Sequence, residues 1–270
     1  MRYFFALPVV ACLLLLSCRS YPHNALIVTN NTSQQKIEYI LKNQIKPYPH
    51  ASLGERIQQV SDQFIGTPYR ADTLSGSESQ PEKLVVDLTG VDCFTFIDYV
   101  NALARATTKE AFYAALIKTR YVEGKITFQN RKHFFTDWAA LPFRNAKDVT
   151  ATVSSHYQQK IKYLNLKADG SRYLPGVEIH KRNITWIPAK SVDQQTMANL
   201  QTGDFIGIYT DIAGLDVTHV GIFIAGDSGP MFRNASSLSK NMKVTDSPFF
   251  EYIKDKPGII ILRPQNQEIK

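Results

Sequence analysis

The sequence predicts an α+β fold in which helices pack on a mostly antiparallel β-sheet. In the first half of the chain, apolar residues recur at the three- and four-residue spacing of one helix face. In the second half, short β-branched and aromatic runs are separated by turn residues. Helices followed by strands, with no regular alternation between them, favour helices gathered against a sheet whose strands pair antiparallel.

Turn residues mark the ends of the helices expected in the first half of the chain. Residues 33–44 predict a short helix that stops before two prolines, and residues 53–64 predict a second helix ending at a Gly-Thr-Pro turn. A brief strand is expected at residues 84–88. Two further helices are expected at residues 92–106 and from Thr107-Thr108 to about residue 121.

Six segments of the second half predict strands. They are residues 148–153, 177–187, 204–210, 217–225, 230–235 and 258–263.

The N-terminus predicts export. Met1-Arg2 supplies a positive start, and residues 3–16 form an apolar run that is too short to cross a bilayer, which takes about 20 residues. The run ends in Leu-Leu-Ser-Cys18, which resembles the bacterial lipobox. We therefore expect residues 1–17 to be a lipoprotein signal peptide and Cys18 to carry lipid that anchors the protein in the membrane. An ordinary secretory signal, with Cys18 incidental, is the alternative.

Location and domain organisation follow from this segment. Arg19 stands where an aspartate is associated with inner-membrane retention, so the periplasmic face of the outer membrane is the expected location. Residues 18–50 are predicted to form a tether and an N-terminal helix, and residues 51–270 a single domain. The net charge of +7 indicates, in an exported protein, anionic wall polymers or lipid headgroups more than nucleic acid.

The three cysteines have separate fates. We expect Cys12 to be removed with the signal peptide and Cys18 to be lipidated, so Cys93 is the one free thiol left in the folded part. In an oxidising compartment, a lone thiol is either buried and inert or retained for its reactivity.

The surroundings of Cys93 indicate a nucleophile. The sequence Gly-Val-Asp-Cys-Phe-Thr-Phe-Ile places Cys93 in the first turn of the expected helix, with Asp92 as its cap. A helix N-terminus favours an anion, so we expect the thiol pKa to fall below its usual value of about 8.5. A small buried thiol with no chemical role is the plain alternative.

The expected partner is a histidine on the sheet. Of the six histidines, only His219 lies within a strong strand pattern, Asp-Val-Thr-His-Val-Gly-Ile-Phe. Alternation puts His219, Gly221 and Phe223 on one face and Val220 and Ile222 on the other. We expect Gly221 to leave room for a helix terminus to approach. A core histidine with a structural role is the alternative.

Taken together, these stretches resemble the NlpC-type, papain-like cell-wall hydrolases, and most closely the N-acetylmuramoyl-L-alanine amidase-like family. The resemblance extends from about residue 52 to 263. It rests on Gly66-Thr67-Pro68-Tyr69-Arg70, Asp92-Cys93, Gly203-Asp204, His219-Val220-Gly221-Ile222, Arg233-Asn234-Ala235-Ser236-Ser237 and the aromatic block from Asn130 to Trp138. Asn234 stands where this family has histidine. The resemblance implies a papain-like core with the nucleophile at a helix N-terminus.

The resemblance also implies roles for individual residues. Cys93 would attack, His219 would act as base, and Asn234 would orient the imidazole. We expect substrate contacts from a set that mixes charge with aromatic rings: Tyr69, Asp92, Arg131, His133, Asp137 and Trp138.

The expected activity is cleavage of the amide between N-acetylmuramic acid and L-alanine in peptidoglycan or muropeptides. Two alternatives remain open: a γ-D-glutamyl endopeptidase of the stem peptide, and a catalytically silent lipoprotein that binds the wall. We expect no cofactor and no metal, because the chain has no His-Glu-x-x-His pattern and one free thiol cannot form a thiolate zinc cluster. We expect a monomer that binds no nucleic acid.

Overall fold

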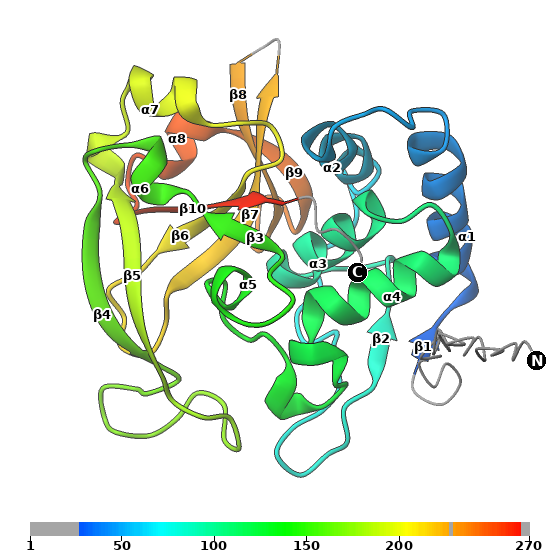
Figure 1. Cartoon of the computed structure of the whole chain (residues 1–270), viewed down its shortest axis with the longest axis horizontal. Helices are drawn as coiled ribbons and strands as arrows, with labels where there is room; N and C mark the ends of the chain where they lie inside the picture. Colours follow the sequence, from blue (N-terminus) through cyan, green and yellow to red (C-terminus); the bar gives the residue numbers. More distant parts are fainter. Residues whose placement is uncertain (1–26, 227–228, 266–270) are drawn as a thin grey trace, which may run out of the picture.

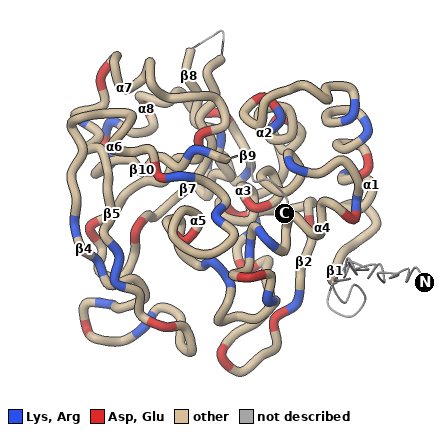
Figure 2. The backbone as a smooth tube through the Cα atoms, viewed as in Figure 1, with Lys and Arg blue, Asp and Glu red and all other residues tan. Residues whose placement is uncertain are grey.

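The computed structural model describes residues 27–226 and 229–265. The predicted signal peptide and Cys18 lie outside these residues. Figure 1 shows the longer helices gathered on one side of the molecule and the large sheet on the other. Basic and acidic residues are interspersed along the chain and are not separated into two halves (Figure 2).

The four long helices confirm the helical half of the prediction. They are α1 (Asn31–Ile40), α2 (Leu53–Asp62), α3 (Cys93–Ala104) and α4 (Lys109–Arg120). A π-helical turn, Leu41–Ile45, extends α1. Each long helix begins after a residue whose side chain accepts a backbone N–H of the first turn: Asn30, Ser52, Asp92 and Thr108. The shorter helices are α5 (Asp137–Ala140), α6 (Thr150–Val153), α7 (Gln194–Asn199) and α8 (Phe249–Ile253).

The large sheet is antiparallel throughout, which confirms the predicted sheet type. Its strands are β3 (Ala146–Asp148), β4 (Gln158–Leu164), β5 (His180–Pro188), β6 (Phe205–Tyr209), β7 (Val217–Gly226), β8 (Gly229–Ser236), β9 (Lys243–Pro248) and β10 (Gly258–Pro264). The strand order is β4-β5-β10-β6-β7-β8-β9, and β3 pairs with β10. A separate parallel pair joins β1 (Ile27–Thr29) to β2 (Leu84–Val86).

The strand prediction is wrong in three places of the large sheet. Residues 148–153 are not one strand: β3 ends at Asp148, whose carboxylate accepts the N–H of Thr150 and so starts α6. Strands β4 and β9 were not expected. Much of the surface of β4 is exposed, and β9 is largely polar, so neither carries the apolar run that marks a buried strand.

The N-terminal segment is also more ordered than a tether. Residues 27–29 pair with β2, and Ile37 and Ile40 of α1 are fully buried in the main hydrophobic cluster. The N-terminal helix expected in residues 18–50 is present as α1, and it packs into the same cluster as the rest of the fold. The apolar face of α1 needs this burial, since an isolated helix of ten residues is marginal in water.

Strand β7 divides two hydrophobic clusters. Val220 and Ile222 belong to the cluster beneath α1 to α4, whereas Phe223 belongs to a second cluster with Phe232 and Phe249 on the other face. The expected alternation along this strand is confirmed. Burial of both faces explains the continuous apolar run from Val220 to Ala225 in β7.

Gly221 has a different neighbour from the expected one. A Cβ at this position would lie 2.6 Å from the carbonyl oxygen of Arg233 and 2.6 Å from the ring of Phe232. The space is therefore filled by the neighbouring strand β8, not by a helix terminus.

Within the described residues, no helix combines the length and the apolar content of a membrane span.

Candidate active site

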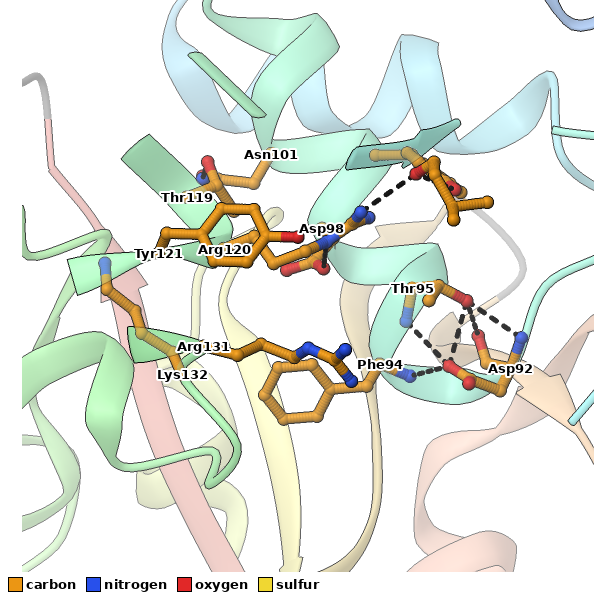
Figure 3. Close-up of polar contacts among 12 residues, drawn as sticks. Asp92, Phe94, Thr95, Asp98, Asn101, Thr119, Arg120, Tyr121, Arg131 and Lys132 are labelled. Atoms are coloured by element: carbon orange, nitrogen blue, oxygen red, sulfur yellow. Dashed lines mark hydrogen bonds and ion pairs between the residues drawn. The ribbon is translucent and has the colours of Figure 1, made fainter. Parts of the chain in front are cut away.

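Asp92 fixes the start of α3. Its Oδ1 accepts the backbone N–H of Phe94 at 2.9 Å and of Thr95 at 2.7 Å, and the Thr95 hydroxyl in turn accepts the N–H of Asp92 (Figure 3). This reciprocal capping box confirms the predicted cap. It holds Cys93, the first residue of α3, in a defined position at the end of the helix.

Cys93 and His219 line the same cavity. The cavity has a volume of about 250 Å³, and its wall includes Phe134, Tyr173 and Leu215 beside the thiol and the imidazole. Cys93 and His219 are each partly buried. The fold therefore brings together two groups that are 126 positions apart in the sequence.

Asn234 holds the imidazole. His219 Nε2 lies 3.0 Å from Asn234 Oδ1, and Asn234 Nδ2 donates to the carbonyl of Phe232 at 3.2 Å. The second bond fixes the amide orientation, so Oδ1 faces the ring and Nε2 carries the proton. Nδ1 is then the unprotonated nitrogen of His219. Asn234 itself is fully buried on β8.

The thiol pKa departs from the sequence-based expectation. Burial, followed by the charge of Asp92, raises the pKa of Cys93 to about 12. The N–H groups of Val220, Cys93 and Phe94 act in the opposite direction but do not compensate. The prediction of a lowered pKa is wrong for the free protein, because it counted the helix terminus and left out desolvation and the charge of the cap.

Burial also lowers the pKa of His219, partly offset by the bond to Asn234. Desolvation disfavours both the thiolate and the imidazolium. In the resting site, a neutral thiol and a neutral imidazole therefore line the same cavity.

Tyr252 completes the setting of His219 and was missed by the sequence reasoning. Its ring centroid lies 6.2 Å from that of His219 at an interplanar angle of 29°, and 4.5 Å from that of Phe232. Burial, followed by the charge of Cys93, raises the pKa of Tyr252 to about 12, so its hydroxyl stays protonated near the thiol. The only sequence signal was an aromatic cluster after Pro248, which has no period of its own.

Two of the expected substrate contacts lie at or near the cavity. Tyr69 is partly buried, and its pKa is raised by burial and then by the charge of Cys93. His133 lines the cavity and also an adjoining hollow of about 400 Å³. Its Nε2 lies 2.7 Å from the carbonyl of Phe128, and burial lowers its pKa to about 4. His133 is therefore neutral at physiological pH.

The remaining members of the aromatic block have structural partners. Trp138 is fully buried and packs edge-on against Phe205 at 5.0 Å, so the expectation that it contacts substrate is wrong. Asp137 is buried and forms an ion pair with Arg182 at 3.0 Å. It also lines the hollow next to the cavity, so its expected contact with substrate stays a prediction.

Arg131 also has a partner within the protein. It forms an ion pair with the fully buried carboxylate of Glu82, which accepts the Tyr121 hydroxyl at 2.7 Å. Arg131 borders the hollow next to the cavity, but this carboxylate already holds its guanidinium.

Helix α3 is anchored beyond its first turn. Asp98, about one and a half turns after Cys93, forms a buried ion pair with Arg120 of α4 at 2.7 Å (Figure 3). Arg120 also donates to the carbonyl of Val85. Asn101 donates to the Thr119 hydroxyl at 2.9 Å. These contacts hold the helix that carries Cys93 against α4 and β2.

Comparison with known proteins places the chain among amidase-like hydrolases. A crystal structure of an N-acetylmuramoyl-L-alanine amidase from Bacteroides uniformis is 27% identical, with a TM-score of 0.67, and the match covers 80% of this chain and all of that one. A putative xylanase from Bacteroides fragilis is 28% identical, with a TM-score of 0.61 and coverage of 75% and 98%. Protein LPG0564 from Legionella pneumophila shares the fold at 24% identity, with a TM-score of 0.70 and coverage of 86% and 96%.

The family assignment is direct. Residues 59–259 match the AmiA-like family, described as N-acetylmuramoyl-L-alanine amidase-like, and the chain belongs to this family. None of the curated proteins compared with the chain matches it. Within the described residues, no group of three or more His, Cys, Asp or Glu is placed to hold a metal ion.

Proposed function

We propose that the protein is a cysteine amidase that cleaves the bond between N-acetylmuramic acid and L-alanine in muropeptides. The observation that carries this proposal is the cavity that Cys93 and His219 share, with Asn234 fixing the imidazole. Membership of the amidase-like family and the likeness to the Bacteroides amidase support the choice of bond. The order of a helix-borne thiol followed by a strand-borne histidine also supports the papain-like, NlpC-type assignment.

The neutral resting pair determines the first step. As the sulfur of Cys93 attacks the lactyl carbonyl carbon, the thiol proton moves to Nδ1 of His219. The new imidazolium is stabilised by the bond from its Nε2–H to Asn234. General base assistance of this kind contributes about 10²- to 10⁴-fold in rate.

The second step releases the peptide. The C–N bond breaks, the imidazolium gives its proton to the departing alanine nitrogen, and a thioester remains on Cys93. Water, deprotonated by the same imidazole, then hydrolyses the thioester to a carboxylic acid and restores the thiol. The backbone N–H of Cys93 lies at the helix end, where it is a candidate donor to the developing oxyanion.

Location remains part of the proposal. We infer from the sequence that the chain is exported and carries lipid on Cys18 at the periplasmic face of the outer membrane. Radioactive palmitate labelling of the expressed protein tests this inference. Loss of the label in Cys18→Ala is the expected result, and equal labelling of both proteins would refute it.

The activity is tested with a defined muropeptide and mass spectrometry of the products. Cleavage at the proposed bond releases the intact stem peptide and the free sugar acid, whereas an endopeptidase splits the peptide. We expect Cys93→Ala and His219→Ala to abolish turnover and Lys181→Gln, an exposed surface change, to leave it intact. Binding of cell walls without turnover, unchanged in Cys93→Ala, would overturn the enzyme assignment.

A further inference from the structure

A second cavity lies away from the proposed active site. It has a volume of about 590 Å³ and lies where α2, the end of α3 and α4 meet. Ala111, Ala114 and Ala115 of α4 form part of its wall. Cys93 begins α3 and Ala104 ends it, so the two sites are separated by about 17 Å along the helix, at 1.5 Å per residue.

Three cations line this cavity: Arg56, Arg105 and Lys118. The described lining contains no acidic residue, and no described ion pair involves any of the three. The cavity is therefore locally positive. Its alanine wall leaves space in front of the charges instead of filling it with larger side chains.

Arg105 is the most informative of the three. Its guanidinium donates to three neutral oxygens, Asn101 Oδ1 at 3.1 Å and the carbonyls of Asn145 and Gln265 at 2.9 and 2.7 Å. Burial lowers its pKa to about 10. Buried charges in proteins are normally paired with an opposite charge, because an unpaired one is costly to desolvate. The described residues supply no such partner.

Arg56 has a donor without a hydrogen-bond partner. Its Nη2 donates to the carbonyl of Pro49 at 2.8 Å, but its Nε is buried and has no hydrogen-bond partner among the described residues. A buried N–H of a charged group without an acceptor is rare in folded proteins. Arg56 lies on α2 and Arg105 follows α3. The unpaired Nε–H of Arg56 and the unpaired charge of Arg105 therefore come from two different elements.

We propose that this cavity binds a polyvalent oxyanion, a di- or tricarboxylate or a phosphate, independently of the thiol site. An oxyanion offers the acceptors and the negative charge that the guanidinium groups lack, and two such groups recognise it with directional hydrogen bonds. Lys118 adds a point charge from α4. The apolar wall suits a ligand with a small carbon body, and the carboxylates of a free stem peptide and a phosphate ester share the required chemistry.

The test is calorimetric titration of the full chain at low ionic strength. Citrate, pyrophosphate and free L-Ala-γ-D-Glu-diaminopimelate serve as separate probes, so the three arms distinguish a compact carboxylate, a phosphate and a peptide source. We expect at least one probe to bind and its affinity to fall as salt is added. Each cation removed should weaken binding by about tenfold or more, the size of a charged hydrogen bond.

The variants separate binding from folding. Arg56→Gln and Lys118→Gln, alone and together, remove charge at the cavity, and Lys181→Gln removes one from an exposed site on β5. Arg105 is left in place because its contacts tie together three segments. We expect the double variant to lose binding, to melt like the wild type and to keep its muropeptide turnover. No binding of any probe by the wild type, or equal binding by the double variant, would overturn the proposal.

A shortened variant serves as a further control in the same titration. The carbonyl of Gln265 accepts from Arg105, so a variant that ends at Gln265 tests whether residues 266–270 compete for the cavity. Tighter binding or unchanged binding in this variant supports the site, and loss of binding contradicts it. Because none of these measurements uses Cys93, failure here leaves the proposed amidase activity standing.

Discussion

Removal of the Asn234 amide is expected to slow turnover by roughly 10- to 100-fold. The bond from His219 Nε2 to Asn234 Oδ1 is 3.0 Å long and fully buried, and it becomes charge-assisted once the imidazole accepts the thiol proton. Hydrogen bonds to charged groups contribute about 1.5–3 kcal/mol, and about 1.4 kcal/mol corresponds to a factor of ten in rate. Asn234→Ala should therefore lower kcat and leave KM nearly unchanged, because Asn234 lies behind the ring and does not reach the cavity.

A second substitution separates the orienting role from simple packing. Asn234→Asp keeps an oxygen acceptor for Nε2–H but adds a negative charge, which raises the pKa of His219. In the wild type, burial places this pKa below its usual value of 6.5, so kcat/KM should rise with pH to a plateau reached below neutrality. Asn234→Asp should move this acid limb to higher pH and retain more activity at alkaline pH than Asn234→Ala.

The assay is steady-state cleavage of a defined muropeptide, with products separated by chromatography and identified by mass. Asn241→Ala serves as a control, since it removes an amide bonded to Ser236, two positions beyond Asn234. Thermal melts show whether each variant is folded. If folded Asn234→Ala turns over within twofold of the wild type while His219→Ala is inactive, the amide does not orient the base and the reasoning is refuted.

Three further outcomes follow from burial and charge. Because the pKa of Cys93 is about 12 in the folded protein, alkylation by iodoacetamide at neutral pH should be at least about a hundredfold slower than in urea, and equal mass-shift rates would reveal a preformed thiolate. The pKa of His133 is about 4 when folded and near 6.5 when unfolded, so the unfolded chain binds the extra proton. The free energy of unfolding should therefore fall by about 3 kcal/mol as pH drops from 6.5 to 4, and His133→Gln should flatten this slope in urea titrations. Arg120→Met leaves the carboxylate of Asp98 buried without its partner and should cost about 3–5 kcal/mol in the same titrations. Lys125→Met, which breaks an exposed ion pair, should leave the free energy of unfolding nearly unchanged, and similar losses in the two variants would contradict the argument.

The helices were predictable because each carries both an apolar period and a capping residue. Strands β6, β7 and β10 were predictable because they contain continuous apolar runs. Strand β4 lacked this signal, since an exposed strand at the sheet edge need not be apolar, and the short β1 is defined by its pairing with a segment 57 positions away. Pairing of distant segments is a tertiary property that local patterns do not encode.

The candidate site likewise has features that the sequence predicts and features that depend on tertiary packing. Cys93, Asp92 and His219 could be identified because cap chemistry and strand alternation are local. The ionisation of the thiol could not be derived, because it depends on how deeply the fold buries Cys93 and on the charge of its own cap. Tyr252 and the buried roles of Trp138 likewise emerge only once separate elements pack together.

The pairing of β1 with β2 has a consequence for the proposed lipid anchor. The chain joins the fold at Ile27, nine positions after the cysteine proposed to carry lipid. Even fully extended, nine residues span only about 30 Å. A protein held by so short a tether would act on wall fragments close to the membrane surface and would not reach across the periplasm.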